Sequence, residues 1–321
     1  MRFVYLMDSM VRVSVDKDTT FAFQRAAQHR GHKALHCELR DLYVKDGDVH
    51  ATVRELHVEA TPPFFRFGER AKVRLADVDA VLIRKDPPFD DAYLYATLLL
   101  ERARGRTVLL NDPRGLRDAN EKLYTLHFAR HMPRTLVSAQ EGLILDFVEE
   151  MGGKGVIKPL FGAGGSGVML IQTGDKNTRA IIELLTDEGR RLVMVQEYLP
   201  AVVEGDKRVL LLDGEVLGAI NRVPRPDDLR SNIHVGGRVE ACEVTEAERT
   251  VVASIASRLR EDGLVFVGLD MIGGRLTEVN VTSPTGIQEL SRHVGRDMAA
   301  PVIEWIERRS ADYQPLAESP G

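Results

Sequence analysis

The sequence has few cysteines and no long apolar run. Cys37 and Cys242 are its two cysteines, and they lie far apart in 321 residues, so neither a disulfide framework nor a thiolate metal site is expected. No stretch approaches the roughly 20 apolar residues that span a bilayer, and the apolar start of the chain is too short for a secretory signal. We therefore expect a cytoplasmic protein with no membrane partner.

The sequence also lacks an excess of basic charge. It has 43 lysines and arginines against 48 aspartates and glutamates, a formal net charge of −5. Binding to a nucleic-acid backbone needs a basic surface, so no nucleic-acid partner is expected. The nine histidines show no metal-binding spacing such as HExxH. The length and a hydrophobic content of 44% predict two or three domains with cores of their own.

The order of predicted elements indicates two kinds of architecture. Residues 1–120 alternate apolar strands with amphipathic helices, which is the βαβ rhythm of a parallel sheet. Residues 43–73 read as an antiparallel or irregular insertion. A helix from Asp118 to about Arg130 is expected to lead into a region where helices alternate with antiparallel strand pairs. The predicted fold class is therefore α/β followed by α+β.

A predicted β-hairpin at 268–280 carries three oxygen ligands for a hard metal. Glu278 and Asn280 are two residues apart on its second strand, so their side chains emerge on one face. A three-residue loop, Gly273 to Arg275 with a glycine at positive φ, would set Asp270 opposite Glu278, whereas a two-residue loop would turn Asp270 away. We expect the three-residue loop. Carboxylate and amide oxygens suit Mg²⁺, with Mn²⁺ as a substitute, although most such patterns are ordinary solvated hairpins.

A glycine-rich segment at 155–171 predicts a phosphate-binding loop. Its glycine spacing fits the GxGxxG pattern, but that fingerprint needs a following helix, and residues 168–172 read as a strand. The backbone N–H groups of such a loop can close over phosphates, and Lys158 on the preceding strand adds positive charge. A flexible turn is the alternative. The expected nucleotide-binding residues here are Lys158, Gly162, Gly164, Gly165, Ser166 and Gly167.

The strand at 193–200 ends in a polar step and a proline. Such a strand end can present backbone groups to an adenine edge, and Glu197 is placed to accept a hydrogen bond from a ribose or an exocyclic amine. Simple termination of the strand at Pro200 is the alternative. The candidate nucleotide-binding residues are Gln196, Glu197, Tyr198 and Leu199.

Three arginines, Arg208, Arg222 and Arg238, bracket a loop close in sequence to the predicted metal site. Planar guanidinium groups stabilise the crowded negative charge of a carboxylate undergoing phosphorylation, so we assign them catalytic roles. Any one of them taken alone would more often be a solvated surface residue.

The assembled motifs resemble the bacterial glutathione synthetases, a family of ATP-grasp ligases, over nearly the whole chain. Four long and compositionally unusual strings carry the resemblance, at residues 84–90, 116–123, 204–209 and 266–285. The resemblance implies a Rossmann-like N-terminal domain at 1–121, two ATP-grasp subdomains at 122–200 and 201–312, and a tail at 313–321.

The resemblance also implies an activity. The enzyme would use ATP to join γ-glutamylcysteine to glycine through an acyl phosphate, giving glutathione, ADP and phosphate, and would form a homo-oligomer, often a tetramer. It adds Lys122 and Asp206 to the ATP site. Arg84 is our candidate for holding a substrate carboxylate, and the remaining expected substrate-binding residues are Asn232, Gly236, Gly237, Ser283 and Thr285.

Two departures from the family pattern bear on the acceptor. Phe161 stands where the family commonly has an acidic residue, and His234 lies in the expected lid at 223–237. A ligase joining another peptide carboxylate to another amino acid therefore remains an alternative. A nucleotide-binding regulatory protein without turnover is a second alternative, and a nicotinamide oxidoreductase, which needs a helix after Gly167, is a third.

Overall fold

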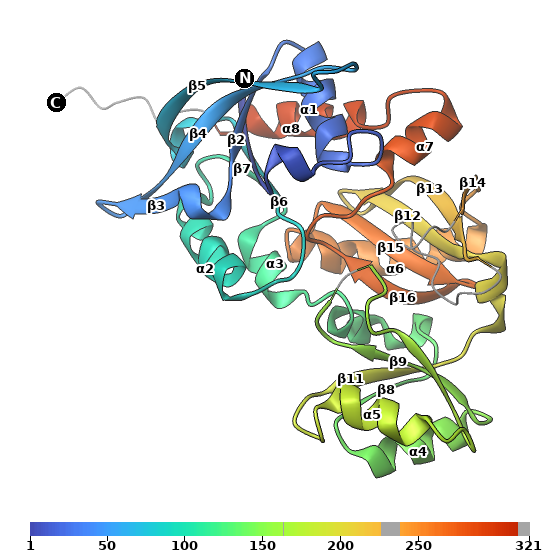
Figure 1. Cartoon of the computed structure of the whole chain (residues 1–321). Coiled ribbons are helices and arrows are strands. Elements are labelled where there is room, and N and C mark those ends of the chain that lie inside the picture. The colour runs from blue at the N-terminus through green and yellow to red at the C-terminus, as the bar shows by residue number, and fades with distance from the viewer. Residues whose placement is uncertain (163, 226–237, 314–321) are drawn as a thin grey trace.

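The structure, a computed structural model, describes residues 1–162, 164–225 and 238–313. Three β-sheets follow one another along the chain, and each has its own helices. In Figure 1 the four-stranded sheet hangs below the other two as a separate lobe. This arrangement confirms the predicted α/β sheet followed by antiparallel sheets.

The first sheet has seven strands, in the order β3-β4-β2-β1-β6-β7, with β5 paired to β4. The strands β1, β2, β6 and β7 pair in parallel, and β3, β4 and β5 add on antiparallel. The bounds are β1 (Arg2–Met7), β2 (Lys33–Cys37), β3 (Leu42–Lys45), β4 (Asp48–Val58), β5 (Phe65–Arg74), β6 (Ala80–Arg84) and β7 (Val108–Leu110). The insertion expected at 43–73 is thus confirmed as the antiparallel part.

Helices cover both faces of the parallel strands. α1 (Thr19–His29) packs with α8 (Ala300–Ser310) in one hydrophobic cluster, and α2 (Asp91–Leu100) packs in another. α1 begins at Asp18, whose side chain accepts a hydrogen bond from Phe21 N at 2.6 Å. Burial on both faces explains why β1 reads as one continuous apolar run.

The second sheet is antiparallel, with the order β10-β9-β11-β8. Its strands are β8 (Thr135–Ser138), β9 (Lys154–Pro159), β10 (Met169–Gln172) and β11 (Val193–Glu197), and α4 (Glu141–Glu150) and α5 (Thr178–Thr186) pack on it. The strand β10 follows the glycine loop directly, so the helix required by a nicotinamide-binding fold is absent there, and the oxidoreductase alternative is wrong.

The third sheet is antiparallel, with the order β14-β13-β12-β15-β16. Its strands are β12 (Asp206–Leu212), β13 (Glu215–Val223), β14 (Arg238–Ala241), β15 (Phe266–Ile272) and β16 (Arg275–Asn280). The helix α6 (Glu246–Glu261) packs on this sheet and begins with a capping box between Thr245 and Glu248.

The hairpin β15–β16 corrects the predicted loop length. Its loop has two residues, Gly273 and Gly274, both at positive φ, and Ile272 pairs with Arg275. A register shift after Asp270 nevertheless sets Asp270 opposite Glu278. The three-residue loop is therefore wrong, but the facing pair is present because a β-bulge adds the extra residue within the strand.

The helix expected from Asp118 to about Arg130 is replaced by two shorter elements. α3 (Pro113–Asp118) begins at Asp112, which accepts a hydrogen bond from Arg114 N at 2.9 Å. Asn120 Oδ1 then accepts from Lys122 N at 3.1 Å and starts the 3₁₀ helix η5 (Leu123–His131). The capping side chains thus divide the segment.

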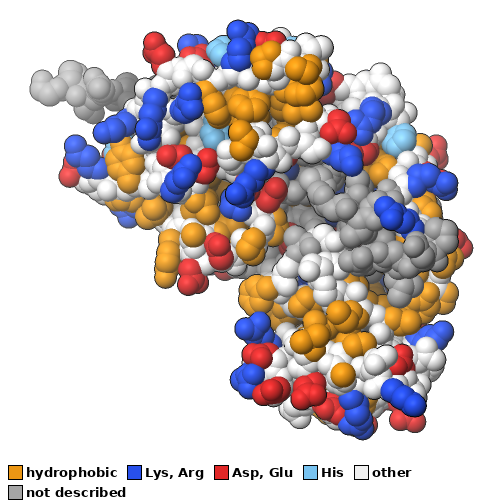
Figure 2. Space-filling model, in the orientation of Figure 1, with side chains coloured by type: hydrophobic (Ala, Val, Ile, Leu, Met, Phe, Trp, Pro, Cys, Tyr) orange, Lys and Arg blue, Asp and Glu red, His pale blue; other side chains and the backbone are white. Residues whose placement is uncertain are grey.

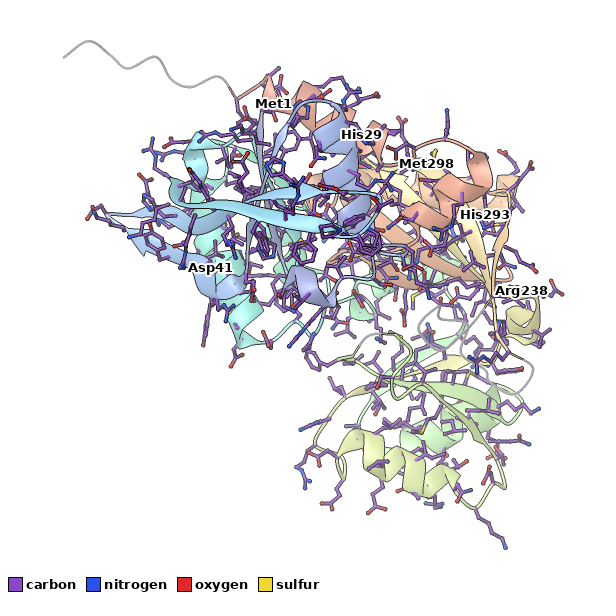
Figure 3. All side chains as sticks on the ribbon, turned by 45° about the horizontal axis from the view of Figure 1, so that its top comes forward. Met1, His29, Asp41, Arg238, His293 and Met298 are labelled. Carbon is purple, nitrogen blue, oxygen red and sulfur yellow. The ribbon has the colours of Figure 1, made fainter. Side chains whose placement is uncertain are left out.

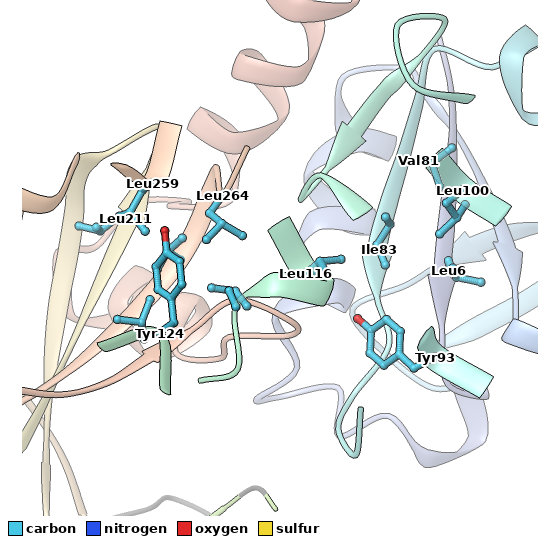
Figure 4. Packing of buried hydrophobic residues seen from close by; sticks show 14 of the residues in the cluster. Leu6, Val81, Ile83, Tyr93, Leu100, Leu116, Tyr124, Leu211, Leu259 and Leu264 are labelled. Carbon is cyan, nitrogen blue, oxygen red and sulfur yellow. The ribbon is translucent and has the colours of Figure 1, made fainter. Parts of the chain in front are cut away.

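Buried side chains connect the first and third sheets. Leu116 on α3 lies between a group around Ile83 and Tyr93 and a group around Leu211 and Leu264, as Figure 4 shows. Because the buried contacts around Leu116 are apolar and continuous, the two sheets share one core. α8 also packs back on α1, where Glu307 pairs with Arg30 at 2.6 Å.

The outer surface carries interspersed acidic and basic side chains on the face shown in Figure 2. In the part of the chain that the structure describes, no helix is both long and apolar enough to cross a membrane. Cys37 is buried and Cys242 is partly buried, and both are free thiols.

Candidate functional site

A cavity of about 610 Å³ lies where the third sheet, the glycine loop and the turn before α1 meet. A smaller cavity of about 110 Å³ lies beside it, against β11. Asp270 and Glu278 line both cavities; they belong to the β15–β16 hairpin, called the metal hairpin below. The two spaces therefore adjoin at the predicted metal site.

Four charged side chains on the third sheet form a buried cluster. Arg208 lies opposite Asp270 in the strand register, and Asp206 lies opposite Arg222, so the alternation of strand side chains puts all four on one face. Arg208 forms a bidentate pair with Asp270, and Arg222 Nη2 lies 2.6 Å from Asp206 and 3.0 Å from Asp270.

The cluster fixes the charges of its members. Burial alone would raise the pKa of Asp270, but Arg208 and Arg222 hold that pKa well below its usual range. Burial works against charge on Arg222 too, yet Asp206 and Asp270 raise its pKa above the ordinary value. Asp270 and Arg222 are therefore ionised at neutral pH. The formal charges of the two arginines and the two aspartates sum to zero.

Two lysines reach the other hairpin carboxylate. Lys122 Nζ lies 3.8 Å and Lys158 Nζ 4.0 Å from Glu278 Oε1, although the lysines come from the loop before η5 and from β9. Burial lowers the pKa of Lys158, and the charge of Glu278 opposes that shift. Two buried cations beside one carboxylate make a site suited to a polyanion.

The predicted metal donors lie on one side of the hairpin. Asp270, Glu278 and Asn280 all line the larger cavity. Asn280 Nδ2 donates to Gly268 O at 3.2 Å, which leaves the amide oxygen as the atom available to a cation. Within residues 1–162, 164–225 and 238–313 no three His, Cys, Asp or Glu side chains cluster as a metal site. A three-donor site on this hairpin would therefore need the amide of Asn280.

The glycine loop lies over the same space. Gly162, Gly164, Gly165 and Ser166 line the larger cavity, whereas a Cβ on Gly167 would lie 2.9 Å from Pro159. Close packing of Gly167 on Pro159 thus fixes the end of the loop. Phe161, the departure from the family pattern, is 74% exposed.

The strand end of β11 lines the smaller cavity with Gln196, Glu197, Tyr198 and Leu199. Gln196 is buried and its amide donates to Thr135 at 3.2 Å, so its side chain is held in place. Apolar residues from β9, β10 and the metal hairpin complete the wall, namely Val156, Met169, Leu170 and Ile272. The mixture of apolar walls and a polar strand end suits a purine base.

Some predicted residues lie apart from these cavities. Arg238 is exposed beside the undescribed segment and pairs with Glu240 at 2.5 Å (Figure 3). Arg84 is buried and donates to Pro284 O at 2.9 Å and to Thr20 Oγ1 at 3.2 Å. Ser283 and Thr285 do line the larger cavity. Asn232, His234, Gly236 and Gly237 fall outside the described residues, as does most of the tail.

Sequence reasoning did not find several residues of the larger cavity. Burial first, and then the charge of Glu278, raise the pKa of Glu121 to about 7. Glu121 precedes Lys122 in the string at 116–123 that carries the family resemblance, so the sequence could have indicated it as a site residue. Other unpredicted lining residues with polar side chains include Arg12, Ser14, Lys17, Asp18 and Asp86 from the N-terminal domain, Thr282 after β16, and Glu289 on α7 (Ile287–Val294).

Solved structures show the same fold at low sequence identity. The crystal structure of D-cycloserine synthetase DcsG has a TM-score of 0.65 at 18% identity and covers 95% of this chain and 99% of its own. A RimK domain ATP-grasp protein from Sphaerobacter thermophilus has a TM-score of 0.63 at 20% identity, with 95% and 99% covered.

Sequence comparisons give the family. The family model of the prokaryotic glutathione synthetase N-terminal domain matches residues 1–117, and that of the ATP-grasp domain matches residues 121–295. Glutathione synthetase from Synechococcus elongatus is 44% identical over 96% of this chain and 98% of its own length. The Salmonella typhimurium glutathione synthetase is 41% identical over 95% and 98%. The chain belongs to the prokaryotic glutathione synthetase family.

Proposed function

We propose that the two adjoining cavities bind ATP and γ-glutamylcysteine and join the dipeptide to glycine. Membership in the family makes the chain an ATP-dependent ligase of glutathione synthesis. The observation that carries the residue assignment is the meeting of Arg208 and Arg222 with the Asp270–Glu278 pair on one sheet face. The alternative of a regulatory protein without turnover gives no reason for that arrangement.

The nucleotide would lie between the second and third sheets. Its base would occupy the smaller cavity beside Gln196 to Leu199, and its phosphates would extend past Lys158 and Lys122 under the glycine loop. Asp206 lines the smaller cavity and holds Arg222 in place. Each lysine already lies within 4.0 Å of Glu278, so the phosphates would enter a site whose cations are in position.

A divalent cation, Mg²⁺ or Mn²⁺, fits the oxygen donors of Asp270, Glu278 and Asn280. When bound, it would offset the charge of the terminal phosphates and polarise them. The fit rests on the shared face of the three side chains and on the free amide oxygen of Asn280.

The chain's own residues support an acyl-phosphate route. An oxygen of the donor's cysteine carboxylate would attack the γ-phosphorus, and ADP would leave. The glycine amine would then attack the acyl carbon, phosphate would leave, and the amine would lose a proton. Arg208 and Arg222 would stabilise the transferring group and the later oxyanion, because they are buried, charged and adjacent to Asp270.

We propose the remaining features by family resemblance. The domain limits are 1–121, 122–200 and 201–312. These limits are supported by the strands, because the first sheet ends at β7, the second sheet runs from β8 to β11, and the third begins at β12. α8 belongs to the third segment but packs back onto the first sheet. We further propose a cytoplasmic homotetramer. Asn232, Gly236 and Gly237 are assigned to a lid over the substrate, and Arg84 to a substrate carboxylate. Arg238 is assigned a catalytic role beside Arg208 and Arg222.

The test is release of ADP as a function of donor and acceptor. With γ-glutamylcysteine and ATP, we expect ADP release that requires glycine and a divalent cation, is abolished by a chelator and is restored by Mg²⁺ or Mn²⁺. Alanine and serine serve as competing acceptors. Faster turnover with either, or ADP release independent of any amine, would contradict the proposal and favour another ligase or a nucleotide-binding protein.

A further inference from the structure

Glu289, on α7, is a buried carboxylate with an unsatisfied oxygen at the larger cavity. Its residue is 5% exposed and lines the cavity. Oε1 lies 3.3 Å from Nη2 of Arg292, which is largely exposed. Oε2 is fully buried and has no hydrogen-bond partner among the residues that the structure describes. An ionised oxygen without a partner costs folding free energy unless a ligand completes it.

The segment around Glu289 is held rigidly. Gln288 donates to Val15 O at 3.0 Å and to Asp18 O at 2.6 Å, and Arg292 donates to Asp16 O at 2.9 Å. These bonds tie α7 to the turn before α1 on both sides of Glu289. The carboxylate is therefore fixed at the wall of the cavity instead of being free to turn toward solvent.

The missing partner is a hydrogen-bond donor. A buried carboxylate oxygen accepts hydrogen bonds and cannot donate, so only a donor, and best a charged one, satisfies it. Burial raises the pKa of Glu289, in keeping with a site that lacks full compensation in the free protein. Arg12 and Lys17 line the same cavity, so the wall offers both signs of charge.

We propose that Glu289 accepts the free α-ammonium group of the donor's γ-glutamyl end and thereby selects γ-glutamyl donors. The inference rests on the proposed function. In a γ-glutamyl dipeptide the amide uses the side-chain carboxyl, so an ammonium and a carboxylate remain free at the end opposite the reacting carboxylate. The single cavity that contains Arg208 and Asp270 also contains Glu289, and its volume lies in the range of small-ligand sites.

The experiment compares two donors in three proteins. The donors are γ-glutamylcysteine and glutarylcysteine, in which hydrogen replaces the ammonium group and the carboxylate stays. The proteins are the parent, Glu289→Gln and a matched control, Glu149→Gln, whose side chain is exposed on α4. ADP release at saturating ATP and glycine gives KM and kcat for each donor.

The expected result is a loss of discrimination. In the parent, KM for glutarylcysteine should exceed that for γ-glutamylcysteine roughly 10- to 100-fold, the range for one charged hydrogen bond. Glu289→Gln should raise KM for γ-glutamylcysteine by a similar factor and leave KM for glutarylcysteine within about threefold. Glu149→Gln should match the parent.

Three results would overturn the inference. These are equal KM values for the two donors in the parent, a Glu289→Gln variant that keeps the parent's preference, and a variant that weakens both donors equally, which indicates a structural role. Should Glu289→Gln not fold, Glu289→Asp must show an intermediate preference. A parent with no glycine-dependent turnover of γ-glutamylcysteine would instead contradict the proposed function itself.

Discussion

Replacing Asp270 by asparagine should destabilise the protein strongly, because it leaves two buried arginines with one carboxylate. Asp270 contacts Arg208 through two bonds and Arg222 at 3.0 Å, and Asp206 contacts Arg222 at 2.6 Å. The four residues are each less than a tenth exposed. Asp270→Asn changes their summed charge from zero to +1 without changing the size of the side chain.

The magnitude follows from the burial of the pair. Removing one partner of a buried ion pair costs about 3–5 kcal/mol, since the remaining charge loses its compensation in a low-dielectric site. Native proteins have free energies of unfolding of about 5–15 kcal/mol, so the variant should lose a large share of its stability. A second change, Arg208→Met, removes the uncompensated charge and should recover part of that loss.

Urea unfolding provides the assay. The single tryptophan, Trp305, donates to Asp213 at 3.0 Å, far along the chain from the substitution, and so reports unfolding by fluorescence. Asp146→Asn, an exposed aspartate on α4, is the control and should lie within about 0.5 kcal/mol of the parent. Asp270→Asn within that same margin, or a double variant whose loss equals the sum of the single losses, would refute the reasoning.

Three further predictions concern charge and packing. Lys158→Met should raise KM for ATP roughly 10- to 100-fold, measured by titrating ATP. Its free energy of unfolding in urea should be equal to or higher than that of the parent, because burial lowers the pKa of Lys158 and makes its charge costly without phosphate. Gly268→Ala should reduce turnover at least tenfold and lower the free energy of unfolding in urea by about 1–3 kcal/mol, since the added Cβ would lie 2.9 Å from Arg208 Cδ. Unchanged turnover would contradict the prediction and show that Arg208 can move aside. Glu307→Gln should reduce the loss of stability in acid, because Arg30, with His32, lowers the pKa of Glu307 from 4.5 to about 2. The lowered pKa contributes about 1–2 kcal/mol of stability above pH 4.5, and this contribution is lost as the pH falls to about 2. Urea midpoints of parent and variant that change in parallel across that window would contradict the prediction.

The hairpin shows how far the sequence predicts the site. The period of two placed Glu278 and Asn280 on one face, and the glycine pair indicated the turn. The sequence did not show that the turn has two residues and that a bulge follows Asp270, because a bulge depends on the pairing of both strands. The correct facing pair was thus predicted through an incorrect loop.

Other features could not be predicted from local patterns. Lys122 and Lys158 meet at Glu278 only through tertiary packing, and the resemblance, not the spacing, singled out Lys122. Glu289 reads in the sequence as an ordinary helical glutamate, and its burial follows from the bonds between α7 and the turn before α1. Such residues carry no periodic signal because one long-range contact decides their environment.

The neutrality of the arginine cluster explains how the same residues can serve the resting and the loaded site. Arg208 and Arg222 are paired with Asp270 in the free protein, so they are held in place without an unpaired buried charge. If the arginines turn to phosphate oxygens, as the proposed function requires, Asp270 would lose its partners and would need a cation. A nucleotide arriving with a divalent cation would replace both halves of each ion pair, whereas a bare nucleotide would leave Asp270 uncompensated. The charge balance of the sheet is therefore a second reason, beside the chemistry of the phosphates, to expect metal dependence.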